Sequence, residues 1–107
     1  MLLLLNINTE EIKMRKSLKE FIKQTNKIIK NENLRINNYH KQIGEYETIM
    51  EVITQTAGSN MAELYREKIS RCYEKIDLAL DKIQHNKEII ATLRTVDKVI
   101  KRGEKSA

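Results

Sequence analysis

The sequence contains no proline and no tryptophan, and it has only three glycines and one cysteine in 107 residues. Without proline, no residue forces a helix to kink or stop. The single cysteine, Cys72, excludes a disulfide within the chain. Four tyrosines and one phenylalanine are the only aromatic residues, so the large side chains that fill a wide core are scarce. These absences favour long helices with a narrow core.

Residues that could build a catalytic or metal site are also scarce. His40, His85 and Cys72 are too far apart in the sequence to form a recognised metal-ligand spacing. The glycines are isolated, so no Gly-rich loop can hold a phosphate. Neither histidine has a nearby serine in the loop context that a nucleophile and base require. We therefore predict a protein that is not an enzyme, with no catalytic residues, no metal site and no cofactor.

What the sequence does contain is a turn at mid-chain. Residues 56–60 are small or polar, with Gly58 at their centre and Ser59 beside it. Asn60 can cap a following helix, and Glu63 completes a capping box three residues later. The sequence therefore predicts an all-α fold. One domain, residues 1–107, forms a long antiparallel two-helix hairpin with helices over about 9–56 and 60–102.

Each expected helix carries a seam that alternates steps of four and three residues, which is typical of coiled-coil packing. Phe21, Ile28 and Ile49 widen the first stripe, and a wider stripe favours assembly into a four-helix bundle with a second hairpin. A homo- or hetero-oligomer is therefore expected. The seam positions are Leu18, Ile22, Thr25, Ile29, Glu32, Ile36, Tyr39, Ile43, Tyr46, Met50 and Ile53, then Ile69, Cys72, Ile76, Ala79, Ile83, Asn86, Ile90, Leu93, Asp97 and Ile100.

Both seams become polar at one level. Folding the chain about Gly58 places Glu32 near His85 and Asn31 near Asn86. A polar layer inside a coiled coil lowers stability but fixes register and partner choice. We predict that these four residues form such a structural layer rather than an acid–base pair.

Charge is distributed unevenly over a chain whose net charge is +5. Residues 13–30 contain seven basic side chains and one acidic side chain, Glu20. Residues 44–81 contain eight acidic side chains and four basic ones. This asymmetry favours association with a charged partner or between copies of the chain. Nucleic-acid binding stays open as an alternative, although no helix-turn-helix or zipper-linked basic region is present. Residues 2–5 are apolar, but this run is far too short to span a membrane.

The second half of the chain resembles the WXG-type helical hairpins of type VII secretion. The residues that carry the resemblance are Ala57-Gly58-Ser59, Leu64-Tyr65, Ile69, Tyr73, Ile76, Ala79-Leu80 and Leu93. Gly58 matches the glycine of the family's turn, and Thr56 stands where the family has tryptophan. The chain is therefore most similar to the Trp-less hairpins that accompany LXG-type toxins. The resemblance implies an adaptor or chaperone that pairs with a larger secreted protein and targets it to the secretion machinery.

Tyr73 and Asp77 match the Tyr-X-X-X-Asp/Glu export signature of the same family. They stand four residues apart, so both lie on one helix face and can contact a single receptor. The alternative is that Tyr73 flanks the core and Asp77 is solvated. For the whole chain, the alternatives are a type III secretion chaperone or a stalk-like coiled-coil protein. We predict a cytoplasmic location, with co-secretion alongside the partner as the alternative.

Overall fold

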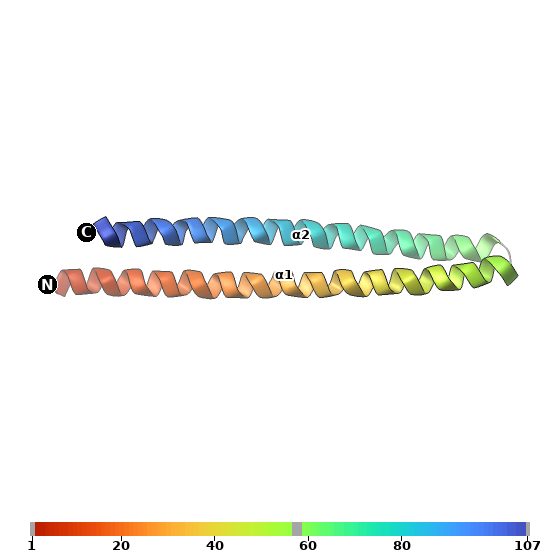
Figure 1. Ribbon diagram of the computed structural model, residues 1–107, viewed down its shortest axis with the longest axis horizontal. Helices are drawn as coiled ribbons and strands as arrows, with labels where there is room; N and C mark the ends of the chain where they lie inside the picture. The colour runs from red at the N-terminus through yellow and green to blue at the C-terminus, as the bar shows by residue number, and fades with distance from the viewer. Residues whose placement is uncertain (1, 57–58, 107) are drawn as a thin grey trace. The chain divides into compact units, whose positions relative to one another are not determined.

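The computed structural model describes residues 2–56 and 59–106, with side chains over residues 9–56 and 60–103. This part of the chain consists of α1, Leu2–Thr56, and α2, Ser59–Ser106 (Figure 1). No strand occurs in it. The predicted all-α fold of two long antiparallel helices is confirmed.

Both helices extend beyond their expected outer ends. α1 begins at Leu2 rather than near residue 9, and α2 continues through Gly103 to Ser106. The expected start rests on Asn8, whose side chain could cap a helix beginning at residue 9. Leucine is a strong helix former, however, so Leu2–Leu5 continue the helix ahead of Asn8. Glycine costs a helix only about 1 kcal/mol relative to alanine, which is too little to end α2 at Gly103.

The connection between the helices is shorter than the predicted turn. α1 ends at Thr56 and α2 begins at Ser59. Asn60 therefore lies within the first turn of α2, where it is exposed, rather than before the helix. Gly58, the expected centre of the turn, lies outside the described residues.

The chain divides into two compact units. Unit 1 comprises Met1–Ile29 and Gln84–Ala107, and unit 2 comprises Lys30–Ile83. Each unit contains one segment of α1 and one of α2, and each is described separately below.

In unit 2, the two segments run antiparallel and pack along the predicted seam. Residues that come later in α1 contact residues that come earlier in α2: Glu32 contacts Lys82, whereas Tyr46 contacts Tyr65. The buried apolar residues are Ile36, Ile43, Ala62, Cys72, Ile76, Ala79 and Ile83. All except Ala62 stand at seam positions that the heptad spacing predicts.

In unit 1, Thr25, Asn86 and Ile90 are buried. The Thr25 hydroxyl donates a hydrogen bond to the Phe21 carbonyl oxygen at 2.8 Å, which satisfies this polar group within its own helix. Arg15 on α1 donates to a carboxylate oxygen of Asp97 on α2 at 3.0 Å. This part-buried ion pair joins the two helices of the unit.

The core is narrow in both units. None of the described side chains is fully buried. The residues expected to widen the seam stay largely exposed: Phe21 is 53% exposed, and Ile28 and Ile49 are each 40% exposed. They flank the core rather than fill it, because a pair of helices has no third element to cover them.

Candidate interaction surfaces

Heptad positions define which side chains share a face. Here the a positions include Ile22, Ile29 and Ile36 in α1, with Ile83 and Ile90 in α2. Each d position lies three residues after an a position. The g row is the set of residues directly before the a positions, and the e row is the set of residues directly after the d positions. These rows border the core on opposite sides.

The shallow depressions of the two units indicate how the rows of α1 and α2 pair. In unit 2, a depression of about 260 Å³ is lined by g-row residues of both helices, Arg35 with Lys75 and Lys82. In unit 1, a depression of about 270 Å³ is lined by e-row residues of both helices, Asn26 with Lys87 and Arg94. Equivalent rows of the two helices therefore face the same side within a unit.

The g side of unit 1 is apolar, and we call it the apolar flank. It repeats a large hydrophobic side chain every seven residues in each helix. Its most exposed members are Phe21 at 53% and Met14 at 49%. Since leaving such side chains in water is unfavourable, this row is suited to contact another apolar surface. The apolar flank consists of Met14, Phe21 and Ile28 from α1, and Ile89 and Val96 from α2.

The g side of unit 2 is polar, and its central feature is a buried carboxylate. Glu32 is 5% exposed. One of its carboxylate oxygens lies 3.2 Å from the Lys82 ammonium and 3.5 Å from an Arg35 guanidinium nitrogen. Two cations therefore lie beside the buried carboxylate, and their attraction offsets the free-energy cost of removing the carboxylate from water.

Two further lysines of the same row lie over tyrosine rings. The Lys68 ammonium is 5.7 Å from the Tyr46 ring centre and 5.1 Å from that of Tyr65. The Lys75 ammonium is 5.8 Å from the Tyr39 ring centre. These are cation–π distances, so the lysines cover the tyrosines at the edge of the core. The three lysines of the row, Lys68, Lys75 and Lys82, therefore all make contacts within unit 2.

The predicted polar layer is divided between the two units. Glu32 and Asn86 are buried, whereas Asn31 and His85 are exposed. Asn31 and Glu32 belong to unit 2, and His85 and Asn86 belong to unit 1. The cation of α2 that lies beside Glu32 is Lys82, almost one helical turn before the predicted His85. The pairing of the four residues across the units stays a prediction.

The predicted export signature lies on the surface of unit 2. Tyr73 is 48% exposed and Asp77 is exposed, both on α2. Their spacing of four residues places them on one helix face. Of the turn residues, Ser59 begins α2 and Asn60 follows it, while Gly58 lies outside the described residues.

Sequence reasoning missed several contacts that join the helices. It did not identify Lys82 as the partner of Glu32, nor Arg15 as the partner of Asp97. It also missed the contact between Arg35 and Glu32 within α1. The g-row position of Lys68, Lys75 and Lys82, seven residues apart, was the available signal, because g-row side chains reach across the interface.

Other kinds of site find no support in the described residues. No group of three or more His, Cys, Asp or Glu side chains there could hold a metal ion. Neither described helix contains a stretch apolar enough to cross a membrane. No protein-family model matches the chain, and the comparisons with curated proteins and with solved structures found no match either.

Proposed function

We propose that this chain is a non-enzymatic helical adaptor that pairs with a helical segment of a larger secreted protein and targets it to a type VII-like secretion system. The observation that carries the pairing is the apolar flank of unit 1. Burying a side chain such as Phe or Met fully stabilises an assembly by about 1.5–3 kcal/mol. Half-exposed members of the flank, such as Phe21, therefore each offer about 1 kcal/mol to a partner.

The periodicity of the flank favours a helical partner. Met14, Phe21 and Ile28 recur every seven residues, which is the repeat that a partner helix with its own heptad seam would match. A partner that contributes two helices would complete a four-helix bundle. The secretion role rests on the resemblance of the second half of the chain to WXG-type hairpins, with Tyr73 and Asp77 as the export signature.

The pairing is tested by capture of a partner with two matched variants. Phe21→Ser with Ile28→Ser removes two members of the apolar flank. Leu34→Ser with Val52→Ser removes two apolar side chains of unit 2, which lie outside the apolar flank and are at least as exposed as Phe21 and Ile28. All four positions are exposed, so both variants should keep their helicity in circular dichroism.

The expected partner is a larger protein whose gene neighbours the gene of this protein. Capture from the native organism followed by mass spectrometry would identify it. The flank variant should recover at least about tenfold less of it than the control variant, because several buried apolar contacts are lost. Equal recovery with both variants would remove the flank as the binding surface. Capture of nucleic acid in place of a protein, sensitive to salt, would favour the nucleic-acid alternative.

The export role has its own test. Asp77→Asn keeps the size of the side chain and the continuity of the helix, so the fold should survive. Export of the partner should fall with Asp77→Asn and with Tyr73→Ala, but not with Glu45→Gln, a matched change at an exposed acid of α1. If export is unchanged with Asp77→Asn, these two residues are not a signal, whether or not the partner is captured.

A further inference from the structure

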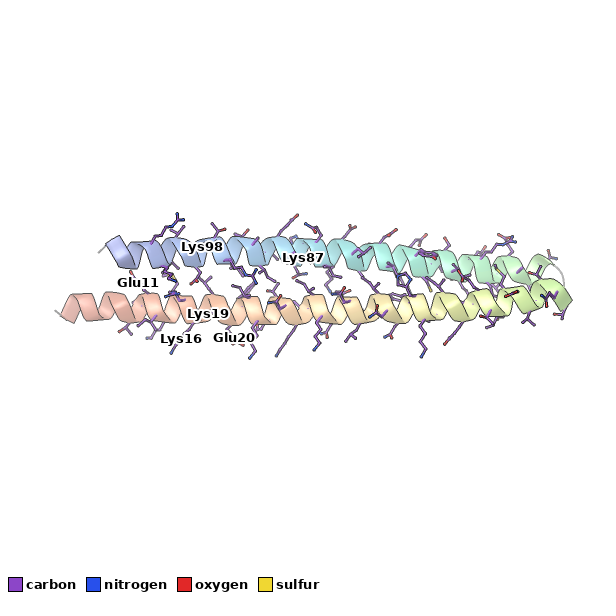
Figure 2. All side chains as sticks on the ribbon, in the orientation of Figure 1. Glu11, Lys16, Lys19, Glu20, Lys87 and Lys98 are labelled. Carbon is purple, nitrogen blue, oxygen red and sulfur yellow. The ribbon has the colours of Figure 1, made fainter. Side chains whose placement is uncertain are left out.

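The e side of unit 1, opposite the apolar flank, is basic. Lys19 projects from α1 there, and Lys87 and Lys98 project from α2 (Figure 2). Among the described residues, no ion pair involves any of its cations. We call this surface the basic flank. It consists of Lys19 and Lys23 from α1, and Lys87, Arg94, Lys98 and Lys101 from α2, all of them exposed.

No described acid of unit 1 belongs to the basic flank. Asp97 and Glu11 stand at seam positions, where Asp97 pairs with Arg15. The other acids, Glu10, Glu20 and Glu88, stand at outer positions of their helices. The flank also contains the depression of about 270 Å³, which Ile29, Ile90 and Ala91 line together with Asn26, Lys87 and Arg94. A partner surface can therefore approach beside Lys87 and Arg94.

The cations of α2 follow the helical repeat. Lys87, Arg94 and Lys101 stand seven residues apart. At 1.5 Å per residue, successive cations are about 10.5 Å apart along the helix axis. A partner whose negative charges repeat at the same interval would meet all three at once.

The chain itself carries such a partner surface. In unit 2, α2 presents Glu67, Glu74 and Asp81 on its outer face, again seven residues apart. All three are exposed, and no described residue forms an ion pair with them. We call these residues the acidic row. Its repeat and its length match those of the cations at 87, 94 and 101.

We propose that the basic flank of unit 1 binds the acidic row of unit 2 of a second copy of this chain. The motive is charge complementarity between two surfaces that share one repeat. The contact uses a different side of unit 1 from the apolar flank, so it does not depend on the proposed adaptor function. The two surfaces differ from each other, so each copy keeps one of each free, and association can continue to further copies.

A nucleic acid fits the same observations less well. The basic flank has no aromatic side chain on which an unpaired base could stack. The acidic row would repel a phosphate backbone that extends over it, and it would have no role. A second copy accounts for both surfaces.

Charge reversal on each surface tests the proposal in the full chain. One variant carries Lys87→Glu, Arg94→Glu and Lys101→Glu, and the other carries Glu67→Lys, Glu74→Lys and Asp81→Lys. A control carries Lys13→Glu, Lys27→Glu and Lys41→Glu at outer positions of α1, which changes the net charge as much as the first variant does. Circular dichroism establishes that each variant keeps its helicity, as their exposed positions predict.

Sedimentation velocity over a range of protein concentrations measures the association. The unmodified chain should self-associate at about 50 mM salt and dissociate at about 500 mM, where screening acts within a few ångströms. Each reversal variant alone should associate at least about tenfold more weakly, because each then opposes like charges. Mixing the two variants should restore association, since each reversed surface then meets its complement. The control should associate as the unmodified chain does.

Three results would overturn the proposal. The first is that the chain stays monomeric at low salt and at a protein concentration of about 1 mM, which is well above the dissociation constants of specific protein complexes. The second is an unchanged association in both reversal variants or no recovery when they are mixed. The third is a fluorescent duplex DNA that binds the unmodified chain and not the Lys87, Arg94 and Lys101 variant, in the absence of self-association, which would assign the basic flank to nucleic acid.

Discussion

Replacing Lys82 by methionine would leave the buried Glu32 carboxylate with only the more distant Arg35 beside it. Breaking an enclosed ion pair by removing one partner costs about 3–5 kcal/mol. The Lys82 side chain is 55% exposed, so water can partly replace it. We therefore expect Lys82→Met to lower the free energy of unfolding by about 1–2 kcal/mol.

The complementary change should act in the opposite direction. Glu32→Leu removes the carboxylate and fills the seam with an apolar side chain, so stability should be unchanged or rise by about 1 kcal/mol. In the Glu32→Leu background, Lys82→Met should cost almost nothing, because no buried charge is left to satisfy. Arg35→Met serves as the control. The Arg35 guanidinium lies 3.5 Å from the Glu32 carboxylate, and the Arg35 side chain is 65% exposed. Arg35→Met should therefore destabilise the protein less than Lys82→Met does.

Urea unfolding followed by circular dichroism measures all four changes, and a double-mutant cycle gives the coupling between Glu32 and Lys82. The expected loss for Lys82→Met corresponds to a fall in Tm of about 5–10 °C. The reasoning would be refuted if Glu32→Leu destabilised the protein by more than Lys82→Met does. Glu32 would then be held by an interaction stronger than its two cations.

Three further changes test the packing of unit 2 by the same urea or thermal unfolding measurements. Gly44→Ala should stabilise the chain by about 1 kcal/mol, because a methyl group there meets nothing within 4 Å; a loss of partner binding with a gain in stability would indicate that a partner helix approaches this glycine. Ile43→Ala should destabilise by about 2–4 kcal/mol, since Ile43 is only 4% exposed, and a loss below 1 kcal/mol would mean that the seam collapses around the cavity. Tyr46→Leu should cost about 0.5–1.5 kcal/mol through the lost contact with the Tyr65 ring 5.8 Å away, and no change would show that this pair lies too close to solvent to contribute.

The seam could be predicted from the sequence because burial in a pair of helices follows a fixed repeat. Ile36, Ile43, Ile76 and Ile83 are buried where the spacing places them, and so is the polar Glu32. A charged residue at a seam position is therefore still carried into the core by its apolar neighbours along the helix. The repeat determines which positions face inward, whatever residue occupies them.

The partners of the polar residues could not be predicted in the same way. The sequence offered Arg35, Lys82 and His85 as possible partners of Glu32, and the structure of unit 2 places Arg35 and Lys82 beside it. Long side chains on neighbouring turns compete for one carboxylate, and the heptad repeat does not decide between them. Helix ends were also uncertain, because Asn8 offers a cap while the leucines before it favour continuation, and these effects differ by less than about 1 kcal/mol. Such near-balanced choices depend on the complete three-dimensional environment.

The separation in sequence between contacting residues has a consequence for the order of folding. Gln42 and Cys72 of unit 2 are 30 residues apart, whereas Arg15 and Asp97 of unit 1 are 82 residues apart. Closing the longer loop directly from the unfolded chain costs about 0.6 kcal/mol more for each doubling of its length. Once unit 2 has formed, however, it shortens the remaining loop, so folding from the turn outward is favoured. Unit 1, which carries both the apolar and the basic flank, then folds after unit 2, and during synthesis it cannot form until its α2 segment, which begins at Gln84, has left the ribosome.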